Sequence, residues 1–359
     1  MNKYLLSILF FATFLISVGC NKQSSPVELN VQTSESESIP ADEAISNSKE
    51  TMEAESLLLP EAIVSSSTTT LSESEVEIVS EPTIIVESES PTTADPSSSD
   101  PFNGMTKIIR YSFEGQEWHG VVSEDGLIQR IEGDLFAQYS LTDQIIPLDQ
   151  VKILAPIVPS KIIAVGLNYR SHAGESGAGA PGLFAKFPSS LAGPDDPIWL
   201  FPESDNTHFE GELVVVIGKT AHNVSVEEAS AYIFGVTAGN DITERTWQTT
   251  DLQWVRAKAS DSFAPIGPFI VTGLDYNDLL VQTRLNGETV QSESTTNLIH
   301  SIEDIVSYTS RYITLEPGDI IYTGTPGSTQ AMVAGDVVEV EVEGVGILRN
   351  TAQDWSPDS

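Results

Sequence analysis

The feature that most constrains this chain is an abrupt change in composition near residue 100. Residues 21–100 consist largely of Ser, Thr, Glu and Pro, in runs such as SSSTTT and ESESPTTADPSSSD, with few aromatic side chains. Such a segment cannot bury enough apolar surface to offset the entropy lost on folding, and its like charges repel one another. We therefore expect a disordered acidic linker over residues 21–104 and folded structure only from residue 105 onward.

The first 20 residues predict export. Lys3 precedes an apolar stretch of about 15 residues, which is shorter than the roughly 20 needed to span a bilayer. The stretch ends at Cys20, the only cysteine of the chain, and this arrangement resembles a bacterial lipoprotein signal. We predict lipidation at Cys20 and an exported cell-envelope lipoprotein anchored to a membrane. The alternatives are an ordinary secretory signal and an N-terminal anchor helix.

The charge of the chain excludes some partners. The 52 acidic residues outnumber the 17 basic ones, which gives a formal net charge of −35. This balance argues against nucleic acid or an anionic membrane surface as a partner. An anionic substrate would need a local cation to hold it, and a bound metal ion would serve.

The folded region alternates short apolar runs with turns, which predicts a β-rich structure. Residues 105–151 are expected to form a small N-terminal β cap of hairpins, with a turn at 124–126. Residues 152–353 are expected to form the catalytic domain. Its clearest strands are 161–166, 212–218, 279–285, 319–323 and 337–342, with a shorter one at 269–271.

Helices are expected to be few. Residues 225–232 predict a helix in which Ser225 and Glu228 close a capping box, and residues 301–312 have apolar side chains at helical spacing. Strands outnumber these helices, so the predicted fold class is α+β, β-rich, in the form of a mixed β-sandwich roll.

Three carboxylates form the first candidate site. Glu210 and Glu212 are two residues apart at the start of an apolar strand, so their side chains leave the same face. Asp241 lies in the otherwise apolar passage FGVTAGNDI. Oxygen-only ligands favour a hard ion such as Mg²⁺, Mn²⁺ or Ca²⁺. The alternatives are a solvent-facing strand edge for the glutamates and an Asx turn or helix cap for Asp241.

A second candidate pair is His172 and Glu175, which lie side by side if their segment is a helical turn. A carboxylate next to an imidazole orients the ring and raises its basicity, as in a general base. A surface ion pair or a helix cap would give the same spacing.

Further polar groups lie near the ends of apolar strands: Lys186, Arg245, Gln248, Lys258 and the turn that contains Thr325. Lys258 could stabilise an enolate or bind a substrate carboxylate, or it could be a surface lysine with a packed stem. The turn could present backbone N–H groups to an anion, or it could be a plain turn.

Taken together and in this order, the motifs of the folded region resemble those of the fumarylacetoacetate hydrolase family. The segments that carry the resemblance are VGLNYRSHAGE (165–175), LFAKFPSSL (183–191), HFEGELVVVIGK (208–219), GNDITERTWQ (239–248), RAKASDSFAPIGP (256–268), LNGETVQSESTTNLIHSI (285–302), LEPGDIIYTGTP (315–326) and GDVVEVEVEGVGILRN (335–350).

The resemblance implies a β-rich roll, assembled as a homodimer, that binds Mg²⁺ or Mn²⁺ through Glu210, Glu212 and Asp241. It also implies a small oxo-acid substrate. The residues that match catalytic positions are His172, Glu175 and Lys258, and those that match substrate positions are Arg245, Gln248 and Thr325.

The first functional hypothesis is hydrolysis of a C–C bond in acylpyruvate-like (2,4-dioxo) acids, with His172 and Glu175 activating water and an enolate as intermediate. The alternative on the same site is an oxaloacetate-type decarboxylase or a dienoate isomerase. A second alternative is a non-catalytic surface lipoprotein that retains the fold.

Overall fold

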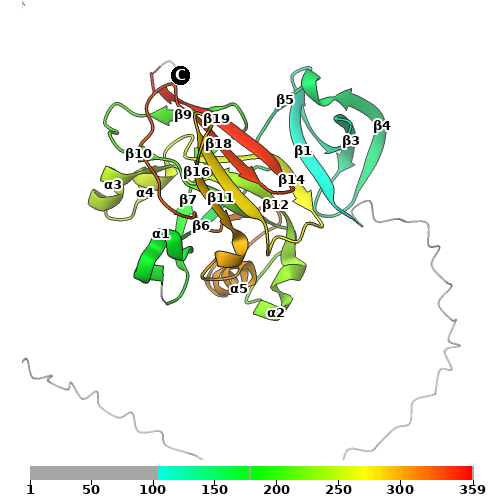
Figure 1. Ribbon diagram of the computed structural model, residues 1–359. Helices are drawn as coiled ribbons and strands as arrows, with labels where there is room; N and C mark the ends of the chain where they lie inside the picture. The colour runs from blue at the N-terminus through cyan, green and yellow to red at the C-terminus, as the bar shows by residue number, and fades with distance from the viewer. Residues whose placement is uncertain (1–103, 178, 358–359) are drawn as a thin grey trace, which may run out of the picture. The chain divides into compact units, whose positions relative to one another are not determined.

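The computed structural model describes residues 104–177 and 179–357 (Figure 1). The predicted signal segment, Cys20 and almost all of the predicted linker lie outside these ranges. Within them, no helix combines the length and the apolar character that crossing a membrane requires.

Most of the strands belong to one 12-stranded sheet. In order across it these are β4 (Tyr139–Pro147), β3 (Leu127–Gly133), β2 (Gln116–Val122), β1 (Thr106–Phe113), β14 (Ala264–Thr272), β12 (Ile233–Asn240), β11 (Gly211–Ile217), β17 (Ile320–Tyr322), β6 (Ile162–Gly166) and β7 (Gly182–Lys186). Off this path, β5 (Lys152–Ile153) pairs with β1 and β8 (Leu191–Ala192) pairs with β14.

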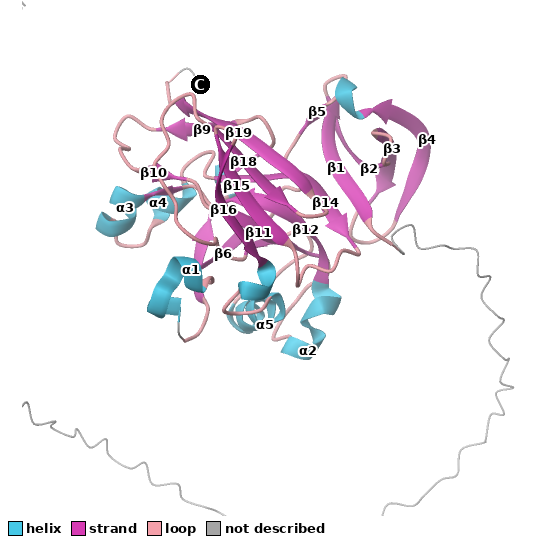
Figure 2. Ribbon diagram, viewed as in Figure 1, coloured by secondary structure: helices cyan, strands magenta, loops and turns pink. Residues whose placement is uncertain are grey.

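A second sheet has five strands. These are β16 (Glu288–Ser294), β15 (Leu280–Leu285), β18 (Val337–Val342), β19 (Gly346–Asp354) and β9 (Pro197–Leu200), while β10 (Thr207–His208) and β13 (Thr243–Glu244) form a small ladder. The helices are α1 (Arg170–Ala173), α2 (Val226–Ala229), α3 (Arg245–Thr250), α4 (Val255–Ala259) and α5 (Ile302–Tyr312). Figure 2 shows α2 and α5 side by side below the central strands, where the two helices are in contact.

The predicted fold class, α+β and β-rich, is confirmed. Both sheets are mixed, because β17 pairs with β6 and β19 pairs with β9 in parallel, whereas most other neighbours are antiparallel. Asn286-Gly287, a dipeptide that favours tight hairpin turns, joins β15 to β16.

Strand β11 is buried on both faces, which explains its continuous apolar sequence. Leu213, Val215 and Ile217 pack in the core that the large sheet shares with the five-stranded sheet and α5. Val214 and Val216 pack in a second core on the opposite face. Side chains alternate along a strand, so the even-numbered residues of β11 share one face.

Two local predictions had the right type of element but were wrong in detail. The helix at 225–232 is only one α-helical turn followed by a 3-10 turn, and the Ser225 hydroxyl contacts the Glu228 carboxylate instead of accepting a backbone N–H. The capping box lies at α5, between Ser301 and Asp304. The strand predicted at 269–271 is also much longer. Pro265 and Pro268 argue against a strand, but Pro268 falls at a register irregularity between β12 and β14, and Pro265 lies where β14 pairs with β8.

Candidate metal centre and active site

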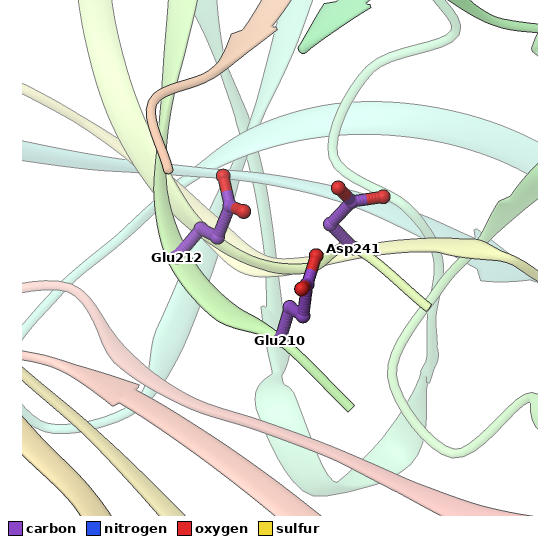
Figure 3. Close-up of side chains that lie close together, drawn as sticks. All are labelled: Glu210, Glu212 and Asp241. Carbon is purple, nitrogen blue, oxygen red and sulfur yellow. The ribbon is translucent and has the colours of Figure 1, made fainter. Parts of the chain in front are cut away.

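Glu210, Glu212 and Asp241 converge at the adjoining ends of β11 and β12 (Figure 3). Gly211 pairs with Asn240 in the antiparallel ladder, so the start of β11 lies beside the end of β12. One carboxylate oxygen from each residue lies within 4.8 Å of the others. The three residues are only 4%, 2% and 1% exposed. Such a buried acidic group could hold a metal ion, as expected for an oxygen-only ligand set.

Backbone contacts hold this geometry in place. The Glu210 N–H donates to Asn240 Oδ1 at 2.8 Å, and the Asp241 N–H donates to the Glu210 carbonyl at 2.8 Å. Glu212 lies on the same face as Val214 and Val216, which pack below it in the second core. Glu212 is therefore held within β11, whereas Glu210 and Asp241 lie one residue outside β11 and β12 and are held by these backbone hydrogen bonds.

Gly211, between the two glutamates, has no room for a side chain. A Cβ atom there would lie 2.0 Å from Thr283 Oγ1. We expect Gly211→Ala to lower the free energy of unfolding by about 1–3 kcal/mol, because overpacking a dense core forces the strand to move. The same shift separates the carboxylates, so Mn²⁺ affinity should fall about tenfold, or ~1.4 kcal/mol.

Urea unfolding and calorimetric Mn²⁺ titration check this expectation. Gly182→Ala is the matched control, because a Cβ atom at Gly182 would make only an ordinary contact at 3.6 Å. Equal effects of the two variants would contradict the account.

Three cationic side chains neutralise most of the acidic group. Lys258 Nζ donates to Glu210 Oε2 at 2.7 Å and to Asp241 Oδ2 at 2.6 Å. Lys186 Nζ donates to Asp241 Oδ1, and Arg245 donates to Glu210 Oε1. Burial opposes the charge of Lys258, but the Asp241 and Glu210 carboxylates outweigh it and raise the Lys258 pKa. Burial likewise opposes ionisation of Glu210, but Lys258 and Arg245 lower its pKa below the ordinary range.

Glu212 differs from its two neighbours. Its Oε2 accepts the Gly324 N–H at 2.7 Å, and no cationic side chain among the described residues forms an ion pair with it. Burial, and next the charges of Asp241 and Glu210, raise its pKa well above the ordinary value of 4.5. A divalent cation between the carboxylates would relieve this penalty, so the residues fit a hard metal ion.

His172 lies at the edge of the acidic group. Its Nδ1 is 2.7 Å from the Gly327 carbonyl oxygen, so Nδ1 carries the proton and Nε2 is the free nitrogen in the neutral ring. Nε2 is 3.6 Å from Glu210 Oε1. Glu175 was predicted to orient this ring, but its side chain lies outside the described residues. The contact that orients His172 here is the Gly327 carbonyl.

One cavity of about 220 Å³ brings the remaining predicted residues together. It is smaller than the roughly 300–1,000 Å³ typical of drug-sized ligands, which favours a small ligand. The lining residues are Val165, Gly166, Leu167, His172, Phe184, Glu210, Glu212, Asp241, Arg245, Gln248, Trp254, Lys258 and Thr325. A larger hollow of about 490 Å³, lined by Phe201, Met332 and Trp355 among others, contains no His, Lys or Arg.

The predicted polar residues are held by a network. Arg245 donates to Gln248 Oε1 at 3.0 Å and to Thr329 Oγ1 at 2.9 Å. The Thr325 hydroxyl donates to the Gly211 carbonyl at 2.9 Å and accepts from Gln291 Nε2 at 2.9 Å. The turn that contains Thr325 presents the Gly324 N–H to a carboxyl group, and that group is the side chain of Glu212.

Sequence reasoning missed several residues that build the site. Asn168 is fully buried and links the turn at Thr323 to residue 300 through its side-chain amide. Phe184 and Trp254 line the cavity with an edge-to-face contact at 5.7 Å. In the sequence, an amide or aromatic residue within an apolar run cannot be distinguished from an ordinary residue of the hydrophobic core. Only the pairing of distant segments assigns these residues to the site.

The comparisons with known proteins decide the family. Residues 161–353 match the sequence model described as "Fumarylacetoacetate (FAA) hydrolase C-terminal", which is more than half of the chain. The chain belongs to the fumarylacetoacetate hydrolase family. Residues 106–156 match a second model, described as "Rv2993c-like, N-terminal".

The chain resembles enzymes of this family that have several different activities. The mitochondrial oxaloacetate tautomerase Fahd2a of Rattus norvegicus is 39% identical over 57% of this chain and 71% of its own length. The crystal structure of a 5-carboxymethyl-2-hydroxymuconate delta-isomerase from Mycobacterium smegmatis is 38% identical, with a TM-score of 0.66, over 69% of this chain and all of that one.

A maleylpyruvate hydrolase from Sphingobium, crystallised with manganese and pyruvate, is 30% identical with a TM-score of 0.59, over 70% of this chain and all of that one. The family to which this chain belongs is therefore a family of enzymes, and it includes a tautomerase, an isomerase and a hydrolase.

Proposed function

We propose that this protein is a divalent-metal-dependent hydrolase that cleaves the C–C bond of small 2,4-dioxo acids of the acylpyruvate type. The observation that carries the proposal is the position of His172 in one small cavity with three buried carboxylates: its Nδ1 contacts the Gly327 carbonyl, and its Nε2 lies 3.6 Å from Glu210 Oε1. An oxygen-only metal site suits a chelating 2-oxo acid, and an adjacent base suits the removal of a proton from water.

The carboxylates of Glu210, Glu212 and Asp241 would hold Mg²⁺ or Mn²⁺, with Ca²⁺ also compatible with oxygen ligands. When bound, the ion supplies a Lewis acid that holds the 2-oxo acid and favours its enolate form.

His172 accepts a proton from water through Nε2 while the Gly327 carbonyl keeps Nδ1 protonated and the ring oriented. The hydroxide adds to the distal carbonyl carbon, a C–O bond forms, and the bond between C3 and C4 breaks. Its electron pair passes to C3 as an enolate, which takes up a proton to give pyruvate. The other product is the carboxylic acid of the acyl group.

Lys258 contributes positive charge beside the developing enolate. The same ammonium group competes with a metal ion for Glu210 and Asp241, because it lies 2.7 and 2.6 Å from their oxygens. We therefore expect Lys258→Met to raise Mn²⁺ affinity about tenfold, or ~1.4 kcal/mol. Turnover should nevertheless fall about 100-fold or more, because the cation near the enolate is lost.

Calorimetry with Mn²⁺ and a steady-state assay separate these two effects. The exposed Lys219 supplies the control variant Lys219→Met, which should change neither. Unchanged or weaker Mn²⁺ binding by Lys258→Met would show that Lys258 does not compete for the site.

A second candidate function is tautomerisation of oxaloacetate. It is supported by the 39% identity to the rat oxaloacetate tautomerase, which exceeds the 30% identity to the maleylpyruvate hydrolase. The reaction needs proton transfer at C3 but no water addition. We therefore expect it to be less sensitive to His172→Ala than to Lys258→Met.

The deciding experiment incubates the protein with acetylpyruvate or enol-oxaloacetate and Mn²⁺ and identifies the products by NMR. We expect acetylpyruvate to yield acetate and pyruvate, and a chelator to stop the reaction. Ketonisation of oxaloacetate without cleavage of acetylpyruvate would favour the second candidate. A protein that neither binds Mn²⁺ nor turns over either acid would be a non-catalytic member of the family.

A further inference from the structure

Two chemically different groups of residues line the cavity. One group is the three carboxylates together with His172, Arg245 and Lys258. The other consists of Val165 from β6, Leu167 after the end of β6, Phe184 from β7 and Trp254 just before α4. We call these four residues the apolar wall. A small acid that fills the cavity therefore meets both polar and apolar surface.

Two members of the apolar wall have an unusual backbone. Among the described residues, seven that are not glycine have a positive φ, and only Leu167 (φ 60°) and Trp254 (φ 56°) carry large apolar side chains. A bulky residue in this left-handed region is disfavoured and persists only when its surroundings impose it. Both of these residues line the same cavity. The fold therefore tolerates local strain at two large apolar residues that line one cavity.

Other contacts tie the wall to the centre of the site. Trp254 precedes α4 and Lys258 lies within it, and the Lys258 N–H donates to the Trp254 carbonyl at 2.9 Å. The Phe184 ring makes an edge-to-face contact with Trp254, with centroids 5.7 Å apart, and Lys258 Nζ lies 4.8 Å from the centre of the same ring. Trp254 is 37% exposed and Leu167 is 44% exposed, so both leave apolar surface for a ligand to cover.

The charges argue against a second carboxylate at this end. The cations that line the cavity are Lys258, Arg245 and, when protonated, His172. Lys258 is bound by two carboxylates, and Arg245 by Glu210, Gln248 and Thr329. Lys258 Nζ lies beside the Phe184 ring of the apolar wall, but Glu210 and Asp241 already bind it. A distal carboxylate at the wall would therefore find no unpaired cation among the lining residues, and its partial desolvation would be costly.

Resting on the proposed function, we infer that the substrate carries an uncharged, planar or apolar acyl group beyond its 2-oxo acid end, and that Trp254 and Leu167 determine this specificity. The distal group packs against the Trp254 and Phe184 rings. Short dicarboxylic oxo-acids lack a group that can make this contact.

Three related oxamates test the inference by binding alone, with calorimetry on the Mn²⁺-loaded protein. Oxamate has no distal group, N-phenyloxamate has a planar apolar one, and N-oxalylglycine has a distal carboxylate. We expect N-phenyloxamate to bind about tenfold more tightly than oxamate, because it buries a ring against the wall. N-oxalylglycine should bind no more tightly than oxamate.

Trp254→Ala should reduce the preference for N-phenyloxamate over oxamate to about twofold or less, and Trp254→Phe should restore most of the preference. Leu167→Gly is an independent variant that suits the positive φ, and it should reduce the preference about threefold. Persistence of the full preference in both variants would overturn the inference, as would tighter binding of N-oxalylglycine. If oxamate itself fails to bind with Mn²⁺, the proposed function fails and this inference fails with it.

Discussion

Replacing His172 with Ala should lower kcat/KM for acetylpyruvate by about 10²–10⁴-fold, the usual contribution of a positioned general base. The reason is that Nε2 is the free nitrogen of a ring held through Nδ1 by the Gly327 carbonyl. Mn²⁺ affinity should change by no more than about threefold, ~0.7 kcal/mol, because His172 is not one of the three carboxylates. A steady-state assay and calorimetry measure the two quantities.

His222→Ala is the matched control, since His222 is exposed and its Nδ1 forms a hydrogen bond with Thr314 Oγ1, away from the acidic group. It should leave both quantities unchanged. A His172→Ala variant with near-native hydrolysis would remove His172 from the mechanism. Loss of Mn²⁺ binding in that variant would instead assign His172 to the metal site.

Replacing Glu212 with Gln should have two opposite effects. The variant should lose the increase in Tm that Mn²⁺ gives the native protein, because a charged oxygen ligand is gone. Without metal, however, it should be more stable than the native protein. Its amide oxygen can still accept the Gly324 N–H, and a buried carboxylate next to Asp241 and Glu210 has been removed. Thermal unfolding with and without Mn²⁺ measures both effects.

The stability gain should depend on pH. The folded protein raises the Glu212 pKa above its ordinary value of 4.5 through burial and the neighbouring carboxylates. At pH values between 4.5 and the raised pKa, the folded state therefore binds more protons than the unfolded state. The free energy of unfolding of the native protein falls as the pH rises through this range. The Tm difference between Glu212→Gln and the metal-free native protein should be small near pH 4.5 and should grow above it.

The exposed Glu288 gives the control Glu288→Gln, for which no Mn²⁺ effect and no pH-dependent difference are expected. If Glu212→Gln retained the full Mn²⁺ response, Glu212 would not be a ligand. If metal-free Glu212→Gln had a lower Tm than the metal-free native protein at neutral pH, the folded protein would stabilise the charge of Glu212.

The fold class was predictable because apolar periodicity is a local signal. The run from Glu212 to Gly218 indicated a buried strand, and the observed β11 covers nearly the same residues. The boundaries of β14 were not predictable, because Pro265 and Pro268 are local signs of a turn. Only the pairing of β14 with its neighbours shows how a buried strand accommodates them: Pro268 lies at a register irregularity with β12, and Pro265 pairs with β8.

The acidic group was predictable for a similar reason. Glu210 and Glu212 share a face by strand periodicity, and Asp241 stood out in an apolar passage. The partners of these residues were not predictable in the same way. Neither the role of Gly327 as the acceptor for His172 nor the bridging position of Lys258 has a signal in local sequence. Both depend on segments far apart in the chain that meet only in the folded sheet.

The apolar wall shows where reasoning from sequence ends. Leu167 and Trp254 have the composition of ordinary core residues, and their positive φ angles are properties of the folded backbone. Sequence periodicity cannot predict such angles for large residues, because local energetics disfavour them. The acidic group therefore indicates the chemistry of the site from sequence, whereas the substrate preference depends on the three-dimensional structure.

The central claim is that Glu210, Glu212 and Asp241 hold one divalent ion that in turn holds a 2-oxo acid. Titration of the metal-free protein with Mn²⁺, followed by electron paramagnetic resonance with and without oxamate, tests it most directly. The account predicts one bound Mn²⁺ per chain, tighter binding when oxamate is present, and no such site in Glu212→Gln. Mn²⁺ binding that oxamate leaves unchanged, or that persists in Glu212→Gln, would contradict it.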